Sequence, residues 1–279
     1  MPRQFADLPG AATLATRQFQ LTAQIIDDLV AALATGVVHG PAGTGKTYAV
    51  EAALERLRDP APAGPVSADQ VSADPAPVVA GMDGPRRPVQ VVTCTVAFPS
   101  RPTMRLVADE LVRALTGSTA ARSRNRFYLT AALVELLSGP PRLLVIDEAQ
   151  RLTGDCIELL RHLHDHPETR FALLYVGGDG CWEVLSREPM LASRVFRRLP
   201  FKKLDRPAVP ALMRSYHRIY DGVADALLWE VEDAYGKGTL RNWAVFTQTA
   251  LSLCDSSGRD RIDTEVIDNA YAKLGGGVA

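Results

Sequence analysis

The sequence is short of the features that mark membrane, secreted or disulfide-rich proteins. It has four cysteines in 279 residues and no C-x-x-C pair, so neither a zinc site nor a disulfide framework is indicated. No stretch approaches the ~18 consecutive apolar residues of a membrane span. The first residues also lack the apolar core of a signal peptide. We therefore expect a soluble, cytoplasmic protein without a membrane partner.

A strong charge of either sign is also missing. The chain has 31 Lys and Arg against 32 Asp and Glu, which leaves a net charge of −1. No overall field therefore draws it to nucleic acid, and any such binding needs a local basic patch. Hydrophobic residues make up 47% and charged residues 23% of the chain, as in ordinary globular proteins. The length suits one large domain, or one large and one small domain.

Residues 40–47 match the pattern G-x-x-x-x-G-K-[ST]. They follow an apolar run at 36–39 and lead into a helical pattern at 48–57, which is the context that a phosphate-binding loop needs. Glycines allow the positive φ angles that turn several N–H groups toward one anion, and the helix N-terminus adds positive potential. We predict that Lys46 reaches the β- and γ-phosphates of a nucleotide and that the Thr47 hydroxyl ligates Mg²⁺. The predicted cradle consists of Gly40, Pro41, Ala42, Gly43, Thr44, Gly45, Lys46 and Thr47.

A second candidate element is the apolar run at 142–148, which ends in Asp147 and Glu148. Such a run is typical of a buried parallel strand, and α/β sheets bind ligands at the carboxyl ends of their strands. Beside a phosphate loop, Asp147 is predicted to hold Mg²⁺. Glu148 is predicted to orient and deprotonate the attacking water.

The remaining patterns alternate between strands and helices up to residue 204 and then predict helices alone, which favours a parallel-sheet α/β domain followed by a helical lid. Further strands are predicted at 89–96, 171–176 and 199–204, and further helices at 17–34, 104–115, 127–137, 157–163, 181–196, 208–220, 223–235, 240–253 and 264–274. We expect an N-terminal segment and helix at 1–36, a nucleotide-binding domain at 37–204 and a lid at 205–279. Residues 59–88 hold seven prolines and no apolar period, so we interpret them as an insertion without secondary structure.

Four segments come in the order found in AAA+ ATPases: residues 40–47, 143–150, 193–195 and 238–241. The chain resembles that family from about residue 17 to residue 255. Within it, the chain is most similar to the ATP-binding subunits of bacterial transposons, the TniB, TnsC, MuB and IstB kind. That local likeness lies at residues 159–165, 173–178 and 187–195.

The resemblance implies a three-layer P-loop fold with a five-stranded parallel sheet and a C-terminal helical lid, and Mg-dependent hydrolysis of ATP. Asp147 and Glu148 match the Walker B acids, and Arg241 matches sensor 2. Arg194 matches the arginine finger, which reaches the γ-phosphate bound by a neighbouring subunit. Arg197 and Arg198 are alternatives for the finger.

The chain departs from the family pattern at one position. Many AAA+ proteins have a polar sensor 1 residue at the end of the fourth strand, where this sequence has Gly177, Gly178 and Asp179. Asp179 is the only candidate, and an aspartate is also common in an ordinary turn. Coupling between the γ-phosphate and this strand is therefore in doubt, and we expect slow turnover.

The resemblance also implies a function, in which ATP-bound subunits self-associate into a ring or helical filament on double-stranded DNA and direct a DDE-type transposase to it. Arginines would contact phosphates without reading sequence. The candidates are Arg101, Arg122, Arg124 and Arg126, and solvated loops are the alternative explanation for them. The alternative function is an AAA+ ATPase of a secretion or signalling system that acts as a nucleotide switch on a protein partner.

Overall fold

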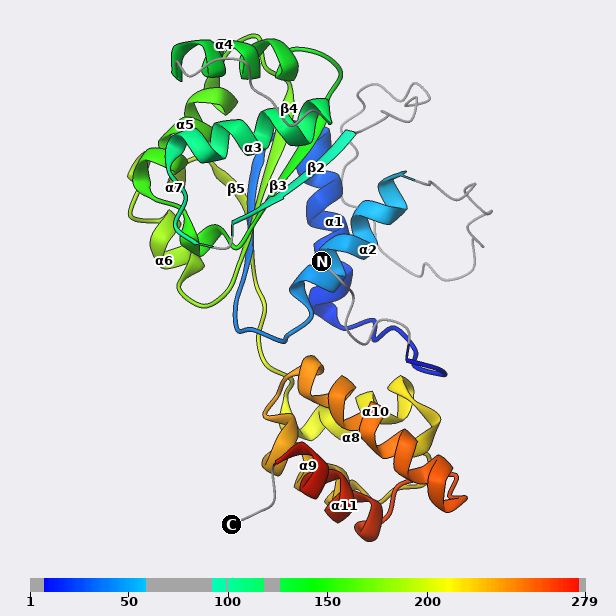
Figure 1. The fold of residues 1–279 in the computed structure, drawn as a ribbon. Helices are drawn as coiled ribbons and strands as arrows, with labels where there is room; N and C mark the ends of the chain where they lie inside the picture. Colours follow the sequence, from blue (N-terminus) through cyan, green and yellow to red (C-terminus); the bar gives the residue numbers. More distant parts are fainter. Residues whose placement is uncertain (1–7, 59–91, 99, 118–125, 276–279) are drawn as a thin grey trace, which may run out of the picture.

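The computed structural model describes residues 8–58, 92–98, 100–117 and 126–275 of the chain. Its centre is a parallel five-stranded sheet in the order β2-β3-β4-β1-β5 (Figure 1). The strands are β1 (Thr35–His39), β2 (Val92–Ala97), β3 (Arg142–Asp147), β4 (Phe171–Gly177) and β5 (Val195–Pro200). This sheet and the helical region after it confirm the predicted fold class. The insertion predicted at 59–88 lies outside the described residues.

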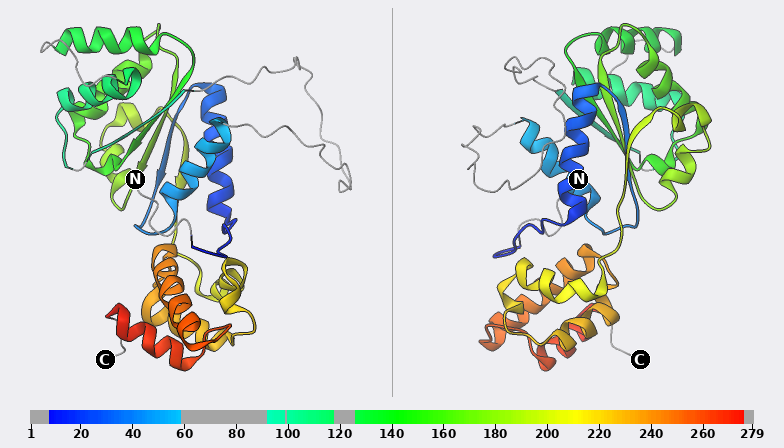
Figure 2. Two further views of the ribbon diagram at one scale, coloured as in Figure 1. Left: turned by 45° about the vertical axis from the view of Figure 1, so that its right-hand side comes forward. Right: turned by 180° about the vertical axis from the view of Figure 1, so that it is seen from behind.

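Helices cover both faces of the sheet and make three layers (Figure 2). One layer contains α1 (Arg17–Ala32) and α2 (Lys46–Arg58). The other contains α3 (Met104–Thr116), α4 (Arg126–Leu137), α5 (Gly154–Asp165), α6 (Cys181–Leu185) and α7 (Pro189–Ala192). Because α1 packs on the sheet beside α2, the N-terminal helix belongs to the same packed unit as the strands.

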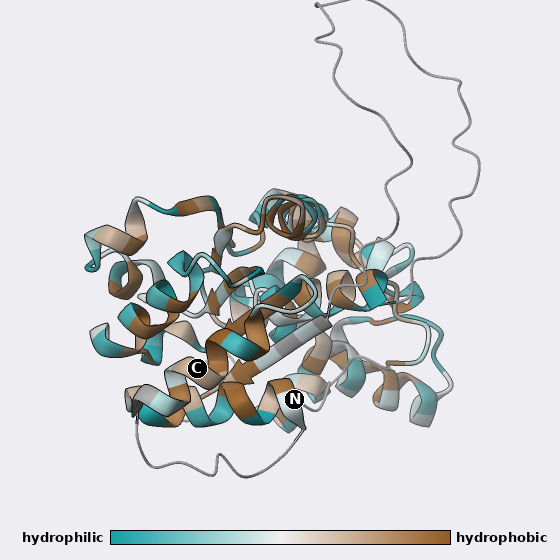
Figure 3. Ribbon diagram, turned by 90° about the horizontal axis from the view of Figure 1, so that it is seen from above, coloured by the Kyte–Doolittle hydropathy of each residue, from teal (hydrophilic) through white to brown (hydrophobic). Residues whose placement is uncertain are grey.

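The core follows from the alternation of side chains along the buried strands. In β3, Leu143 and Val145 point into the cluster beneath α1 and α2, whereas Leu144 and Ile146 point into the cluster beneath α3, α4 and α5. All four are at most 2% exposed. Figure 3 shows apolar residues concentrated along the strands between the helical layers. Both faces of the strand are buried, which is why the sequence reads as one continuous apolar run.

The predicted helix at 181–196 and the predicted strand at 199–204 are wrong in their bounds. The chain forms the short helices α6 and α7, and β5 already begins at Val195 and ends at Pro200. β5 is at an edge of the sheet and pairs with β1 alone in the described chain. Its outer positions therefore accept exposed residues such as Phe196 and Arg198, and these mask the apolar pattern of a strand.

The lid is a helical unit below the sheet in Figure 1 with a hydrophobic cluster of its own, centred on Trp243 and Phe246. Its helices are α8 (Val209–Tyr216), α9 (Asp225–Val231), α10 (Leu240–Ser257) and α11 (Thr264–Leu274). The helix predicted at 223–235 is shorter than expected, because α9 passes into a π-helical turn, Glu232–Gly236. The side chain of Asn242 donates to the carbonyl of Tyr235 in that turn at 2.9 Å. No helix among the described residues has the length and apolarity needed to cross a membrane.

Candidate nucleotide-binding site

The predicted phosphate loop joins the carboxyl end of β1 to the start of α2. Gly40, Gly43 and Gly45 have φ angles of 139°, 77° and 90°. The loop closes around its own lysine, because the Lys46 ammonium donates to the carbonyl oxygens of Gly40 at 2.7 Å and Pro41 at 2.6 Å. Lys46 is 8% exposed. The loop therefore presents a buried cation at the N-terminus of a helix, where an anion is favoured.

Four charged groups act on the ammonium of Lys46. Burial lowers the pKa of Lys46, and the nearby guanidinium of Arg241 lowers it further, whereas the carboxylates of Asp179, Asp147 and Glu148 act in the opposite direction. These interactions place the two candidate Walker B acids, Asp179 and the candidate sensor 2 residue around the lysine. The structure thus brings together residues that are up to 195 positions apart in the sequence.

Asp147 ends β3, and its carboxylate accepts a hydrogen bond from the backbone N–H of Glu148 at 2.8 Å. Burial raises the pKa of Asp147, and the Glu148 carboxylate adds to that effect, while the N–H of Glu148 and the Lys46 ammonium oppose it. Glu148 has a left-handed backbone with φ of 55°, which is uncommon for a residue other than glycine. Its Oε2 accepts hydrogen bonds from Gln150 Nε2 at 2.7 Å and Arg151 Nε at 3.2 Å.

These residues fit a nucleoside triphosphate with Mg²⁺. Among the described residues, the Lys46 ammonium contacts two carbonyl oxygens and no carboxylate at ion-pair distance, so its charge remains available to a phosphate. Asp147 and Thr47 would supply the oxygen ligands that Mg²⁺ prefers. Thr47 is exposed at the start of α2, so its hydroxyl is accessible to a metal ion.

The lid contacts the phosphate loop directly. The backbone N–H of Arg241, near the start of α10, donates to the carbonyl of Gly43 at 3.0 Å. A Cβ atom at Gly43 would lie 3.1 Å from the Cβ of Arg241 and 3.3 Å from the Cβ of Thr239. Glycine is therefore required at this position both for its positive φ and for the close approach of the lid.

Arg194 lies at the amino ends of the parallel strands, whereas the phosphate loop lies at their carboxyl ends. It precedes Val195, which pairs with Thr35 at the amino end of β1, whereas the loop follows His39 at the carboxyl end. At ~3.3 Å per strand residue, the two ends of β1 are roughly 13 Å apart. Arg194 therefore does not belong to the nucleotide site of its own chain.

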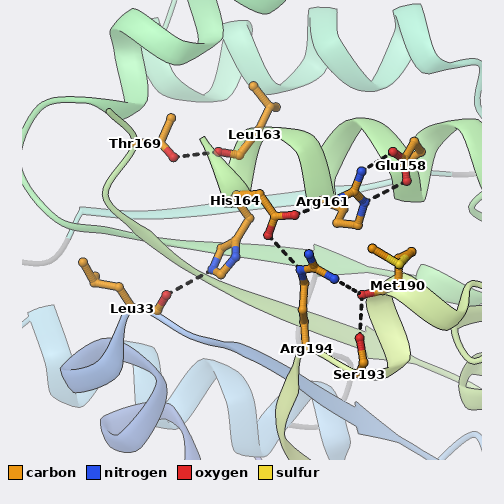
Figure 4. Close-up of polar contacts among 10 residues, drawn as sticks. Leu33, Glu158, Arg161, Leu163, His164, Thr169, Met190, Ser193 and Arg194 are labelled. Atoms are coloured by element: carbon orange, nitrogen blue, oxygen red, sulfur yellow. Dashed lines mark hydrogen bonds and ion pairs between the residues drawn. The ribbon is translucent and has the colours of Figure 1, made fainter. Parts of the chain in front are cut away.

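Arg194 makes its polar contacts with α5 and α7 (Figure 4). Its Nε donates to Asp165 Oδ1 at 3.0 Å, and its Nη1 donates to the carbonyl of Met190 at 2.8 Å. Asp165 also pairs with Arg161 of the same helix. Met190 and Phe196 flank this arginine in the sequence and are 53% and 45% exposed.

The two alternative arginines are each hydrogen-bonded to a residue of their own chain. Arg197 Nε donates to Asp28 Oδ2 on α1 at 2.8 Å. Arg198 Nε donates to His39 Nε2 at 2.9 Å, and its guanidinium lies 4.2 Å from the ring centre of Trp182. Burial, and secondly the Arg198 charge, lower the pKa of His39 and so favour the neutral ring, and the Arg198 Nε–H bond selects the tautomer whose Nε2 can accept.

Two of the four arginines predicted to contact DNA lie among the described residues. Arg101 is exposed on the connection between β2 and α3. Arg126 is the first residue of α4, and Arg122 and Arg124 lie outside the described residues. The role of all four in binding DNA remains a prediction.

The sequence analysis missed Gln150 and Arg151, which both contact Glu148, and Thr239, which meets the phosphate loop. The only signal for the first two is their place in the tight turn after Glu148, where side chains two and three residues apart can meet. Thr239 has a local signal as the N-cap of α10, since its Oγ1 accepts from Asn242 N at 3.4 Å. Nothing in the sequence indicates its contact with Gly43.

Comparison with known proteins agrees with this geometry. A family model described as "AAA domain" matches residues 34–185. No curated protein sequence matches the chain significantly.

Solved structures resemble the whole fold at low identity. The Aeropyrum pernix ORC2 protein in ADPNP-ADP complexes is 17% identical over 98% of this chain and 71% of that chain, with a TM-score of 0.64. Cdc6p from Pyrobaculum aerophilum is 16% identical over 99% and 71%, with a TM-score of 0.67. The Aeropyrum pernix ORC1 protein in complex with DNA is 14% identical over 98% and 68%, with a TM-score of 0.60. At these identities the likeness concerns the fold alone.

Proposed function

The chain belongs to the AAA domain family, and on that premise we propose that it is an ATPase that assembles on double-stranded DNA when ATP is bound and directs a DDE-type transposase to that DNA. The observation that carries the proposal is the division of the candidate catalytic residues. Lys46, Asp147 and Glu148 lie at the carboxyl ends of the parallel strands, whereas Arg194 lies at their amino ends. A complete site then needs two subunits.

In the proposed mechanism, Lys46 binds the β- and γ-phosphates of ATP at the loop. Mg²⁺, when bound by Thr47 and Asp147, neutralises phosphate charge. Glu148 orients a water and accepts its proton as the water attacks the γ-phosphorus, while the bond from that phosphorus to the β,γ-bridging oxygen breaks and ADP leaves. Arg194 of a neighbouring subunit stabilises the charge that develops there, an effect worth about 10³–10⁵ in rate in well-studied GTPases. Hydrolysis therefore depends on assembly.

The DNA part of the proposal is supported by the related fold of the Aeropyrum pernix ORC1 protein, whose structure was solved in complex with DNA. A chain with a net charge of −1 has no strong general attraction for DNA. Assembly compensates for this, because each added subunit contributes further weak phosphate contacts on the same duplex. Arg101 is the exposed candidate for such a contact in the described chain.

The transposase part rests on the sequence resemblance of residues 159–195 to the ATP-binding subunits of transposons. In this proposal ATP acts as a timer, since hydrolysis releases the assembly and so limits how long a DNA segment is marked. Co-sedimentation of a DDE-type transposase with the ATP-bound assembly on DNA would support this part. A transposase that stays in solution would count against it.

A mixing experiment tests the shared site. Glu148→Gln supplies an intact arginine to its neighbour but lacks the base, whereas Arg194→Ala keeps the base but lacks the arginine. Each variant alone should hydrolyse ATP at under about 1% of the wild-type rate, and an equimolar mixture should recover a substantial part of it. Arg187→Ala, which removes another exposed arginine of the same stretch, is the control and should remain active. A mixture as inactive as its components would contradict the shared site.

A further inference from the structure

Gln150 joins the predicted catalytic base to the end of the neighbouring strand. It lies in the 3-10 turn Ala149–Arg151 that follows Glu148. Its Nε2 donates to Glu148 Oε2 at 2.7 Å, and its Oε1 accepts from the backbone N–H of Gly178 at 2.9 Å. The chemistry fixes this orientation of the amide, because a carboxylate can only accept and a backbone N–H can only donate. One side chain thus bridges β3 and the end of β4.

The bridge explains Gly177, the first of the two glycines at the place where a polar sensor 1 residue was expected. A Cβ atom at Gly177 would lie 2.6 Å from Gln150 Oε1 and 2.4 Å from Cys181 Sγ. Cys181 is fully buried, so its Sγ cannot move away at low cost, and the Gln150 amide could make room only by breaking its two hydrogen bonds. A side chain at residue 177 and the amide of Gln150 therefore compete for the same space.

We propose that Gln150 is the positioning residue that takes the place of sensor 1 in this chain. It holds the Glu148 carboxylate in the orientation needed for proton transfer and links it to the end of β4. Gly177 pairs with His39, the last residue of β1 before the phosphate loop, so the bridge ends on the strand that lies beside that loop. This inference rests on the proposed function, because it requires Glu148 to be the base.

The geometry around Glu148 indicates why such a residue is needed. The side chain of Glu148 is 34% exposed, and its backbone has the left-handed φ noted above, so packing alone does not fix its carboxylate. Gln150 and Arg151 both donate to Oε2. Gln150 also accepts a hydrogen bond from the backbone N–H of Gly178, which directly follows β4. A general base works efficiently only when it is held within hydrogen-bond reach of the water that it deprotonates.

Two substitutions separate positioning from structure. Gln150→Glu keeps an acceptor for the Gly178 N–H but replaces the donor to Glu148 with a second carboxylate. Gln150→Met has a similar volume and loses both hydrogen bonds. Gln248→Glu, at an exposed position on α10, controls for the added charge. The readouts are kcat and KM for ATP, binding of a fluorescent non-hydrolysable ATP analogue, the thermal unfolding midpoint, and amide hydrogen exchange at Gly178.

We expect kcat to fall by about tenfold to a hundredfold in both Gln150 variants, with analogue binding within about twofold of the wild type. Exchange at Gly178 should accelerate in Gln150→Met and stay slow in Gln150→Glu, even in the protein without nucleotide. A merely structural role would lower the unfolding midpoint of Gln150→Met and leave the kcat of Gln150→Glu unchanged.

Glu148→Gln, measured beside them, separates the possible failures. If it abolishes hydrolysis while Gln150→Glu turns over at the wild-type rate, the positioning role is wrong and the proposed function stands. If Glu148→Gln itself hydrolyses ATP normally, Glu148 is not the base and both claims fall. Unchanged exchange at Gly178 in Gln150→Met would show that the bridge does not form in solution and would also overturn the inference.

Discussion

The guanidinium of Arg194 is paired with a carboxylate of its own chain, with Nε 3.0 Å from Asp165 Oδ1. Both side chains are about one third exposed, and exposed ion pairs of this kind are worth about 0–1 kcal/mol. The pair is therefore weak enough to be exchanged for the phosphate of a neighbour.

We predict that Asp165→Asn promotes assembly by removing this competing contact. The protein concentration needed for half-maximal ATP hydrolysis should fall, by up to about fivefold if the pair contributes 1 kcal/mol. A titration of specific activity against protein concentration measures this. Glu158→Gln is the matched control, because it removes another acidic partner of Arg161 without touching Arg194. A higher half-maximal concentration in Asp165→Asn would contradict the prediction.

Gly43→Ala is predicted to loosen the lid as well as strain the loop. Its cost should exceed the ~1 kcal/mol of an alanine in the left-handed region, because the new methyl group also meets Thr239 and Arg241. Gly258→Ala is the control, since Gly258 has φ of 66° and nothing within 4 Å of an added Cβ. Denaturant unfolding gives the cost, and amide exchange at Arg241 reports the contact with Gly43. Equal exchange at Arg241 in both variants would show that the lid does not depend on this glycine.

Asp147→Asn is predicted to stabilise the protein in the absence of nucleotide. Folding raises the pKa of Asp147 above its ordinary value of 3.8, so between that value and the raised one the folded state binds more protons than the unfolded chain. The free energy of unfolding therefore falls as pH rises through this window, and the loss is complete above the raised pKa. Asparagine carries no charge and keeps an acceptor for the Glu148 N–H.

Thermal unfolding checks that prediction. The variant should melt at a higher temperature than the wild type at pH 7, and the difference should shrink as the pH approaches 4. It should also lose the additional stabilisation that Mg-ATP confers on the wild type. A variant less stable than the wild type at pH 7 without nucleotide would show that the buried charge is not a net cost.

His39 gives a pH dependence of the opposite sign. Its pKa is below the ordinary value of 6.5 in the folded protein, so on acidification the unfolded chain takes up a proton before the folded protein does. The free energy of unfolding should therefore decrease as pH falls from 6.5 toward the lowered pKa. His39→Gln keeps an acceptor for Arg198 and should show a smaller loss of stability between pH 7.5 and pH 5.5.

Denaturant unfolding at the two pH values measures this loss, and His162→Gln, at an exposed position of α5, is the control. Some dependence should remain in His39→Gln, because burial also lowers the pKa of His164. An identical loss in His39→Gln and the wild type would exclude His39 as a source of the pH dependence.

The fold was predictable from the sequence where its signals are local. The phosphate loop is a contiguous motif between a strand and a helix, and β3 is a continuous apolar run because both of its faces are buried. The helix predicted at 104–115 is α3, and the residue before it, Thr103, is its N-cap, with Oγ1 accepting from Leu106 N at 3.2 Å. The strand predicted at 199–204 lies too late in the chain compared with β5, because an edge strand with alternating exposed residues has no continuous apolar run.

The candidate site was predictable only in part, for the same reason. The individual motif residues were identified, but their contacts join elements that are distant in the sequence. The bridge from Gln150 to Gly178 depends on the pairing of β3 with β4, and the pair of Arg194 with Asp165 depends on the packing of α5 beside the start of β5. No spacing rule in the sequence specifies either contact.

The central claim is ATP-dependent assembly on DNA, and sedimentation tests it most directly. The wild type and Lys46→Ala would be centrifuged with plain double-stranded DNA at moderate salt, with and without a slowly hydrolysed ATP analogue. The account predicts large protein–DNA assemblies only for the wild type with the analogue. If the wild type binds the analogue and still leaves the DNA in the supernatant, or if Lys46→Ala sediments equally well, the claim is wrong.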